Sequence, residues 1–496
     1  MALGVLGLAA PVLAQSTSGG GWRVQPEVTL QQSFTDNVRL AATDTQSEAI
    51  TEVRAGFSAR GRSSSTQGSL RYALSSFAYQ NGTAPRSHQN SLNANLESEL
   101  VDKQGFVTLA ASIAQSTVSA FGALGESATL VQANSTEVRS LRINPRWTGL
   151  LAPTLDYNVA ADFNASDTSD GTVGRSLSST YTANVVSDSG GAINWDLGGT
   201  RVQSGFGNGG RRSSSDRLTG RVRWRIVDLD LETYASGGSE RSNQVSSERQ
   251  SHATWGLGGA WVPSPRMRVG LDLEDRPFGT THKLALLYRW PMTTVQLSST
   301  RALSTSATTL RAGAASTVYQ LIDAQFQASE PDPVRRAELV EAYLRDNGLS
   351  GADLVVSNLL TSASSLQTNQ TLSVALRGTR SSLVLNLGHG VSRRIDRSSS
   401  VSDDLSSASE VVQDSASAQW THRLTPHLGV TAELAMQRNH GDLPTQFSQQ
   451  RSATLRASGR WTKELSWTLS ARRALYQTAT SPYADRLITG SISARF

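Results

Sequence analysis

Apolar and polar residues alternate with a period of two along most of this chain, which predicts β-strands with two different faces. The last ten residues, 487–496, show the pattern most clearly. One face carries Ile488, Gly490, Ile492, Ala494 and Phe496, and the other carries Thr489, Ser491, Ser493 and Arg495. An apolar face that ends in an aromatic residue is typical of the final strand of an outer-membrane β-barrel. The edge strand of a soluble sandwich is the alternative interpretation.

The same alternation continues upstream and predicts about 22 strands between residues 25 and 496, within a range of roughly 18 to 24. Short turns such as Thr462-Lys463-Glu464 alternate with longer polar loops, such as the one between Met436 and Leu455. This asymmetry is typical of barrels with short periplasmic turns and long extracellular loops. The predicted fold class is therefore an all-β, transmembrane antiparallel β-barrel, closed so that every backbone polar group has a partner.

Tryptophans support the same topology, because eight of them fall beside predicted short turns with the apolar parity of their strands. They are Trp147, Trp195, Trp224, Trp261, Trp290, Trp420, Trp461 and Trp467. Indole rings favour the interface between lipid and water, so this set predicts an aromatic girdle at the periplasmic rim. Burial in an ordinary protein core is the alternative interpretation.

Residues 317–348 break the two-residue period. Helical spacing relates Val318, Leu321, Ile322, Gln325 and Phe326, and a second helical stripe follows Pro331-Asp332-Pro333. The pattern predicts one helical hairpin inserted between strands on the extracellular side. Because its apolar stripes would be unstable in water, we expect it to pack into the extracellular half of the lumen or against a partner protein.

The N-terminal residues indicate export. Residues 2–14 are mostly small and apolar, and Val12-Leu13-Ala14 has the form of a signal peptidase site, although no positively charged residue precedes it. We therefore expect a signal peptide over 1–14, a periplasmic segment over 15–24 and the barrel over 25–496. The 496 residues include no cysteine, so an exported fold cannot depend on disulfides. A closed, hydrogen-bonded barrel supplies another source of stability.

Arginine, rather than lysine, supplies most of the basic residues behind the formal charge of +5. In the predicted strand 216–226, arginines alternate with apolar residues and so face the lumen, and two acidic residues follow on the next strand. The predicted lumen charge stripe consists of Arg217, Arg221, Arg223, Arg225, Asp230 and Glu232, together with Arg456, Arg460 and Arg472. Such groups either set a transverse field in a pore or form cross-strand ion pairs that neutralise its wall.

Catalytic chemistry is sparse in this sequence. The seven histidines show no metal-ligand spacing, and no glycine-rich phosphate loop or Gly-x-Ser-x-Gly elbow occurs. His440 with Asp442 could begin a hydrolytic pair, but both residues belong to a polar loop in which such residues usually serve solubility. The sequence therefore predicts no enzyme, no metal site and no cofactor, and a barrel hydrolase is the weaker hypothesis.

Several short motifs resemble those of one family. The opening Phe34-Thr35-Asp36-Asn37-Val38, the run Pro331-Asp332-Pro333-Val334-Arg335 leading to Asn347-Gly348-Leu349, and the Phe496 ending resemble outer-membrane β-barrel proteins associated with exosortase (PEP-CTERM) systems. The resemblance spans most of the chain after residue 22. It implies a cell-envelope context beside exopolysaccharide biosynthesis and protein sorting in Gram-negative bacteria. It supplies no catalytic residues.

Together these features predict a pore or export conduit for polysaccharide or other polar solutes in the bacterial outer membrane. A non-conducting structural or assembly scaffold is the main alternative. The expected partners are outer-membrane lipids, the barrel-assembly machinery, with Phe496 as the assembly signal, and an exopolysaccharide or its export proteins. Nucleic acid is not expected, because the arginines recur at alternate positions and face a common space inside the barrel.

Overall fold

The computed structural model describes residues 21–123, 125, 127, 129–131, 134–168, 175–207, 212–304, 326, 333–346, 364–395, 403–479 and 482–496. The predicted signal peptide over 1–14 lies outside the described residues. The predicted periplasmic segment over 15–24 is described only from residue 21, and the first strand begins at Arg23.

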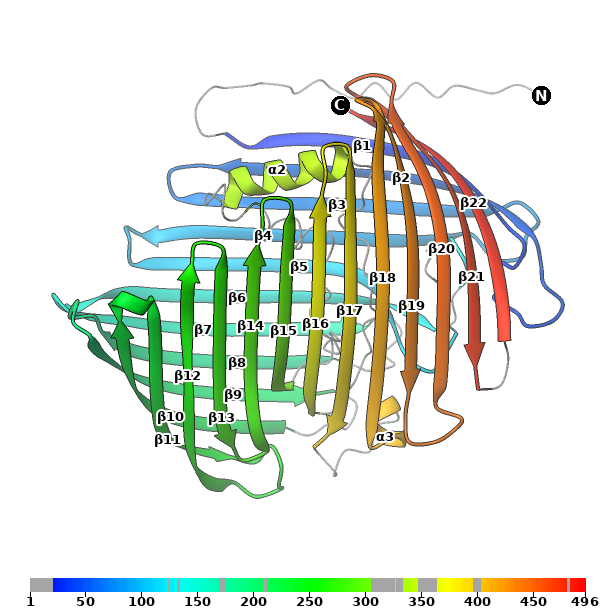
Figure 1. Ribbon diagram of the computed structural model, residues 1–496. Helices are drawn as coiled ribbons and strands as arrows, with labels where there is room; N and C mark the ends of the chain where they lie inside the picture. Colours follow the sequence, from blue (N-terminus) through cyan, green and yellow to red (C-terminus); the bar gives the residue numbers. More distant parts are fainter. Residues whose placement is uncertain are drawn as a thin grey trace.

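Twenty-two antiparallel strands form one closed sheet (Figure 1). They are β1 Arg23–Thr35, β2 Glu48–Arg62, β3 Thr66–Tyr79, β4 Ser87–Val101, β5 Gly105–Thr117, β6 Ser135–Ala152, β7 Leu155–Thr168, β8 Ser176–Ser187, β9 Ile193–Phe206, β10 Arg212–Ile226, β11 Leu231–Ser242, β12 Gln250–Ser264, β13 Met267–Arg276, β14 Gly279–Arg289, β15 Thr293–Ser304, β16 Ser365–Arg377, β17 Ser381–Arg394, β18 Glu410–Thr425, β19 Leu428–His440, β20 Phe447–Arg460, β21 Leu465–Thr478 and β22 Pro482–Arg495. Each strand pairs with the next along the chain. Closure comes from β1 and β22, whose register places Leu30 opposite Ile492. The predicted closed antiparallel barrel of about 22 strands is confirmed.

The apolar face of every strand points outward. On β10, Leu218, Val222 and Trp224 are more than half exposed, whereas the residues between them face the lumen. The pattern recurs around the barrel, for example at Leu434 and Leu455, which are 62% and 57% exposed. An apolar wall of this extent would aggregate in water, and a lipid bilayer covers it. Because the barrel is closed, no strand edge is left unpaired in the bilayer. The protein is therefore an outer-membrane β-barrel.

The two ends of the barrel differ, and we call them the turn end and the loop end. At the turn end, successive strands are joined by connections of at most five residues, such as Pro153–Thr154 between β6 and β7. At the loop end most connections are longer, such as residues 36–47 between β1 and β2, although residues 207–211, 277–278 and 479–481 make short ones. The start of β1 and the end of β22 both lie at the turn end (Figure 1). In a barrel with an even number of strands this is the periplasmic side.

Three helices have their bounds within the described residues: the 3-10 helix η1 Val227–Leu229, α2 Pro333–Asp346 and α3 Asp404–Ser407. No helix in the described part of the chain is both long enough and apolar enough to cross a membrane. Helix α2 matches the second helical stripe of the predicted hairpin. The first stripe, over 317–328, lies outside the described residues except for Phe326, which is helical.

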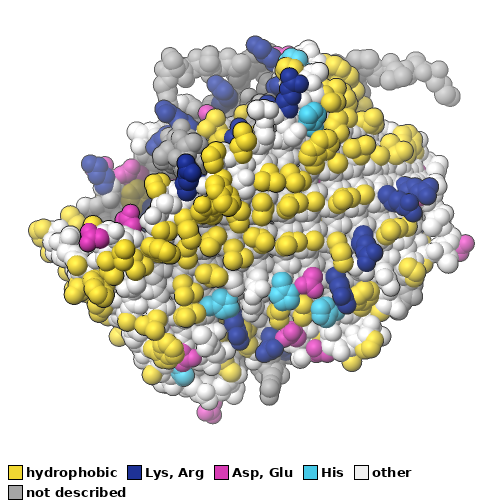
Figure 2. Space-filling model, viewed as in Figure 1, with side chains coloured by type: hydrophobic (Ala, Val, Ile, Leu, Met, Phe, Trp, Pro, Cys, Tyr) yellow, Lys and Arg dark blue, Asp and Glu magenta, His cyan; other side chains and the backbone are white. Residues whose placement is uncertain are grey.

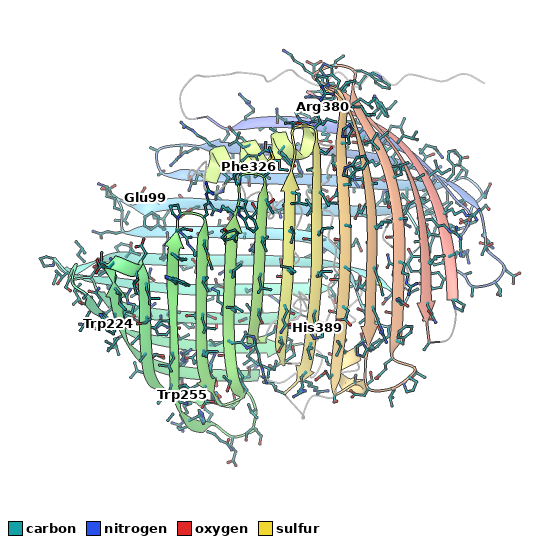
Figure 3. All side chains as sticks on the ribbon, viewed as in Figure 1. Glu99, Trp224, Trp255, Phe326, Arg380 and His389 are labelled. Atoms are coloured by element: carbon teal, nitrogen blue, oxygen red, sulfur yellow. The ribbon has the colours of Figure 1, made fainter. Side chains whose placement is uncertain are left out.

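Helix α2 lies at the turn end, and this corrects the expectation that the insertion packs into the extracellular half of the lumen. The guanidinium of Arg377, the last residue of β16, is 5.4 Å from the Tyr343 ring of α2 and 5.7 Å from the Phe326 ring. Arg377 lies beside the short turn to β17, and Figure 3 places Phe326 near the same end. The segment joins β15 and β16 at the loop end, so α2 lies a full strand length away. The order of the flanking strands indicates the end of the barrel at which an insertion is attached, but not how far along the lumen the insertion reaches.

Candidate functional site

The lumen wall formed by β9 to β14 holds the main part of the predicted charge stripe. Arg217, Arg221, Arg223 and Arg225 all have the lumen-facing parity of β10, opposite to that of the exposed Leu218 and its neighbours. The register sets Arg225 directly opposite Glu232 on β11. The period-two alternation of the strand is what aims these four side chains into one space.

Carboxylates from three strands meet these arginines. Arg223 is 3.2 Å from Asp196 on β9 and 3.9 Å from Glu232, while Arg225 is 3.8 Å from the same Glu232. Arg217 forms an ion pair and hydrogen bond with Glu274 on β13. Ion pairs between residues of different strands thus line this wall.

Arg221 meets an aromatic ring instead. Its guanidinium lies 4.2 Å from the centre of the Tyr234 ring, and the Tyr234 hydroxyl donates to Asp272 on β13. A cation over a ring face is attracted by the electron-rich face of the ring. Each of the four arginines in the stripe therefore has a compensating partner, and the geometry favours neutralisation of the wall over an uncompensated transverse field.

Asp230 is not part of this wall, which corrects its assignment to the strand after the turn. It follows η1 in a left-handed conformation with φ 46° and ψ 41°, and β11 begins one residue later at Leu231. The chain needs the left-handed residue to reverse direction after the 3-10 turn. Aspartate tolerates this conformation better than most residues because its short side chain can bond locally.

Arg456, Arg460 and Arg472 have lumen-facing parity on β20 and β21, but they lie on a different part of the wall from β10 (Figure 1). Arg472 donates to Asp485 on β22 at 2.8 Å, and both side chains are almost completely buried. The predicted stripe is therefore divided between two walls.

The best-buried ion pair of the β9 to β14 wall was not predicted. Arg276 on β13 donates to both oxygens of Glu240 on β11, at 2.9 and 2.8 Å, and Ser215 donates to the same carboxylate at 2.7 Å. The Glu240 side chain is 0% exposed. Both residues lie just beyond the ends of the strands predicted over 229–237 and 266–275, and only the register across β12 shows that they meet.

Replacing Arg276 with methionine should destabilise the barrel by about 3–5 kcal/mol, because a buried carboxylate loses its cation. The temperature at which the barrel unfolds on heat-modifiable gel electrophoresis should fall accordingly. Arg225→Met is the matched control, because Arg225 is 61% exposed and its loss should cost about 1 kcal/mol or less. Equal shifts for the two variants would contradict this ranking.

Three loops fold over the loop end of the lumen, and we call them the loop cap. They comprise residues 36–47, the described residues of 118–134, and residues 403–409. Val38 packs with lumen-facing Ile50 and Phe77, and Val131 lies against the same cluster. The Val131 amide donates to the Val38 carbonyl at 3.0 Å. The first two loops are therefore joined inside the mouth of the barrel.

Asp404 joins the third loop to the second. Its carboxylate accepts hydrogen bonds from the Ser119 hydroxyl at 2.8 Å and from the Ala120 amide at 2.6 Å. Ala120 packs with Leu405 and Val411 directly beside these bonds. Burial raises the pKa of the Asp404 carboxyl above its ordinary value of 3.8, and the two hydrogen bonds only partly oppose that rise.

The loop cap should therefore open more readily as pH rises. A raised pKa means that the closed cap binds the Asp404 proton more tightly than the open cap. Its stabilisation is complete below the ordinary pKa near 3.8 and is lost as pH rises through the higher pKa of the closed state. Single-channel recordings should show longer closures at about pH 4 than at about pH 7. Asp404→Asn should remove most of this dependence, and an unchanged dependence in that variant would exclude Asp404 as its source.

The eight tryptophans of the predicted girdle lie within a few residues of the turn end, and seven of them are more than 40% exposed. Trp224 is two residues from the end of β10, and Trp147 donates its indole N–H to Tyr157 at 3.1 Å. Trp255 was missed. It is 56% exposed, faces outward, and lies near the loop end of β12, on the other side of the bilayer from Trp224 (Figure 3).

Phe496 lies at the turn end and is 74% exposed, and its amide donates to the Pro26 carbonyl at 3.1 Å. The C-terminal residue is therefore held beside β1, where the barrel closes.

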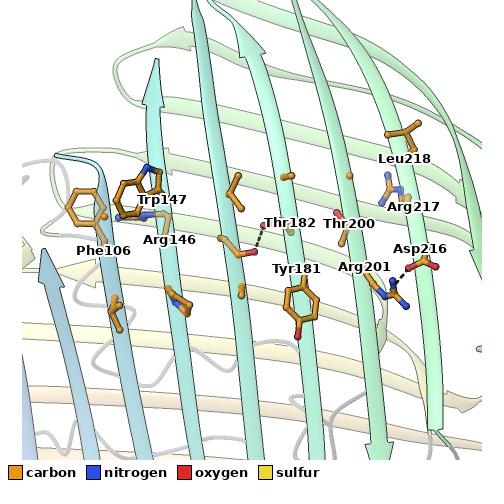
Figure 4. Close-up of a pocket in the computed structure, with 18 of the residues that line it drawn as sticks. Phe106, Arg146, Trp147, Tyr181, Thr182, Thr200, Arg201, Asp216, Arg217 and Leu218 are labelled. Atoms are coloured by element: carbon orange, nitrogen blue, oxygen red, sulfur yellow. Dashed lines mark hydrogen bonds and ion pairs between the residues drawn. The ribbon is translucent and has the colours of Figure 1, made fainter. Parts of the chain in front are cut away.

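A groove of about 820 Å³ crosses the outer wall of β5 to β11 (Figure 4). Small residues, Ala161, Ala183 and Gly199, lie between larger ones such as Trp147 and Leu218. Its lining is mainly apolar and faces the membrane, so the groove suits lipid chains and is not part of a polar pathway through the lumen. The Arg201–Asp216 pair, at 3.4 Å, stands towards its loop end.

His440 and Asp442 do not form a hydrolytic pair in the described part of the chain. Asp442 accepts a hydrogen bond from the Ser409 amide at 2.6 Å, and no hydrogen bond joins it to His440. Within the described residues, no group of three or more His, Cys, Asp or Glu side chains could hold a metal ion.

No protein-family model matches the chain, and no curated protein matches it. Among solved structures, it is similar to the siderophore receptor PirA from Acinetobacter baumannii, with a TM-score of 0.48 and 9% identity over 97% of this chain and 81% of that one. The FrpB iron transporter from Neisseria meningitidis gives 0.49 and 11%, over 95% and 82%. The copper transporter OprC gives 0.44 and 9%, over 97% and 81%. The fold assignment rests on the strand pairing and the exposed apolar wall.

Proposed function

We propose that this barrel is a conduit for neutral polar solutes, with an exopolysaccharide as its substrate, in an exosortase-associated envelope system. The charge-compensated wall of β9 to β14 carries the proposal. Because each of the four arginines there has a carboxylate or ring partner, the wall has little net field with which to select ions. It still presents hydrogen-bond donors and acceptors in quantity.

A carbohydrate is the solute class that suits such a wall best. Sugar hydroxyls both donate and accept hydrogen bonds, so they can exchange partners along alternating guanidiniums and carboxylates without carrying charge into the lumen. Part of the wall is open to solvent, since Arg225 and Glu232 have side-chain exposures of 61% and 35%. The resemblance of the short motifs to exosortase-associated barrels supports the same substrate class.

A scaffold without conductance is the second candidate. The loop cap and α2 favour it, because they occupy opposite ends of the lumen. We assign no catalytic role, since His440 and Asp442 are not joined. The proposed partners are outer-membrane lipids, the assembly machinery acting on Phe496, and the polysaccharide or its export proteins.

The assignment to polysaccharide export is tested in the native host. Deleting the gene should reduce cell-surface polysaccharide and leave its precursors in the cell, and the wild-type gene should restore export. Normal surface polysaccharide in the deletion strain would contradict the assignment. A variant with the loop cap locked, by cysteines at Val38 and Val131 in this cysteine-free chain, should fail to restore export until the disulfide is reduced.

A further inference from the structure

Charged residues on the outer wall are confined to the loop-side half of the barrel. Along the described strands, the outward-facing positions of the turn-side half carry no Lys, Arg, Asp or Glu. The exposed outward-facing arginines in the other half are Arg139, Arg201, Arg212, Arg241, Arg393, Arg438, Arg451, Arg473 and Arg486. An arginine that faces lipid is unfavourable unless an anionic partner meets it. The outward-facing arginines of the loop-side half therefore require anionic partners.

Some of these arginines have carboxylate partners. Arg139 is 2.8 Å from Glu137, and Arg393 is 2.6 Å from Glu410 on the neighbouring strand. The last four strands differ, because β19 to β22 carry outward-facing arginines and no outward-facing acidic residue. We call Arg438, Arg451, Arg473 and Arg486 the arginine row. Figure 2 shows dark-blue side chains stepping across this part of the apolar wall.

The register concentrates positive charge in the row. Arg473 and Arg486 lie directly opposite each other on β21 and β22, an arrangement of like charges that destabilises a sheet. Asp414 lies opposite Arg438 but binds His389 at 2.7 Å. Asp36 forms an ion pair with Arg486 at 3.9 Å, and the Arg438 guanidinium lies 5.7 Å from the Phe447 ring. Within the described residues, no carboxylate forms an ion pair with Arg451 or Arg473.

A pocket adjoins the row on its loop side. It encloses about 630 Å³ between the β1–β2 loop and the loop-side ends of β20 to β22, where lumen-facing Tyr476 and Tyr483 also line it. Arg451, Leu475 and Ala484 belong to its wall-side lining, and Asp36 and Thr45 belong to its loop side. Towards the middle of the bilayer the same strands present Leu455, Leu469 and Ile488, all more than half exposed. The site thus combines a pocket of mixed polar and apolar lining, a basic row and an apolar surface in the order of a lipid's head group and acyl chains.

We propose that the arginine row and its pocket bind the phosphorylated glycolipid of the outer leaflet. Arginine is suited to phosphate because its planar guanidinium donates two parallel hydrogen bonds. The row crosses three inter-strand spacings, about 14 Å in all, which is too wide for one phosphate group. The ligand is therefore a head group that carries two separated phosphates, and Arg451 and Arg473 are its central contacts.

Native mass spectrometry of the full barrel, incubated with bis-phosphorylated lipid A, tests the proposal. Arg451→Gln with Arg473→Gln should retain at least tenfold less lipid than the wild type, whereas Arg451→Lys with Arg473→Lys should retain an intermediate amount. The matched control is Arg139→Gln with Arg393→Gln, which removes two outer arginines that already have carboxylate partners and should leave binding unchanged. Heat-modifiable migration on gels verifies that each variant is folded.

Three results would overturn the proposal. The first is equal lipid retention by the wild type and the folded Arg451→Gln, Arg473→Gln variant. The second is equal loss in the control variant, which would indicate a general effect of outer charge. The third is equal binding of mono-phosphorylated lipid A or of phosphatidylglycerol, since neither carries two separated phosphates.

Discussion

Deletion of residues 317–348, with the flanking strands kept, should raise the single-channel conductance by roughly an order of magnitude. A barrel of this size encloses a wide bore, and helix α2 stands at its turn-side mouth. Assembly should be unaffected, because barrel closure depends on the pairing of β15 with β16 and of β1 with β22. Planar-bilayer recordings of the purified deletion variant measure the effect.

A single substitution tests the contact between α2 and the turn end of the barrel with a smaller perturbation. Arg377 faces both Phe326 and Tyr343, and cation–π contacts of this kind contribute about 0.5–1 kcal/mol each at exposed sites. Arg377→Ala should therefore raise the frequency of open events. Arg380→Ala is its control, because Arg380 lies in the adjacent β16–β17 turn (Figure 3) and has no such ring contact within the described residues. If the deletion variant folds and conducts no better than the wild type, α2 does not obstruct the path.

Removing one sign of charge from the β9 to β14 wall should give the pore an ion selectivity that the wild type lacks. Asp196→Asn with Glu232→Gln leaves Arg223 and Arg225 uncompensated, so the reversal potential in a salt gradient should shift towards anions. Arg223→Gln with Arg225→Gln should shift it towards cations. Each change should alter the permeability ratio by roughly threefold or more, since charges lining a pore set the local ion concentration.

The opposite signs of these two shifts are the decisive feature. A general loosening of the barrel would change both variants in the same direction. Reversal potentials that stay at the wild-type value in both variants would show that ions do not pass along this wall.

The strands could be predicted from the sequence because each one must separate lipid from lumen along its whole length. The first strand, predicted over 25–35, is Arg23–Thr35, and the turn Thr462-Lys463-Glu464 lies between β20 and β21 as expected. The last strand was predicted from residue 487 but begins at Pro482. Tyr483 is lumen-facing yet buried, because it packs with Leu40 and Leu130 of the loop cap. Because an aromatic residue faces the lumen there while Arg486 faces outward, the alternation that predicts the rest of the strand is lost.

Contacts between distant segments could not be predicted in this way. The pairing of Arg276 with Glu240 depends on the register of three strands, and the bond between Ser119 and Asp404 joins loops that are 285 residues apart. Helical spacing identified α2 but carried no information about its depth in the lumen. Outer arginines such as Arg473 break the alternation in the sequence, because they occupy positions of the lipid-facing side where the other residues are apolar or small.

Block of single channels by a neutral oligosaccharide tests the central claim most directly. In planar bilayers, the wild-type barrel should open to discrete conductance levels, and a neutral oligosaccharide added to one side should interrupt them in proportion to its concentration. The interruptions should be shorter in the variant that lacks Arg223 and Arg225, because two hydrogen-bonding groups of the wall are gone. If neither the wild type nor the 317–348 deletion variant forms channels, the carbohydrate conduit is contradicted and the scaffold remains as the function. The same conclusion follows if channels form but no neutral sugar interrupts them.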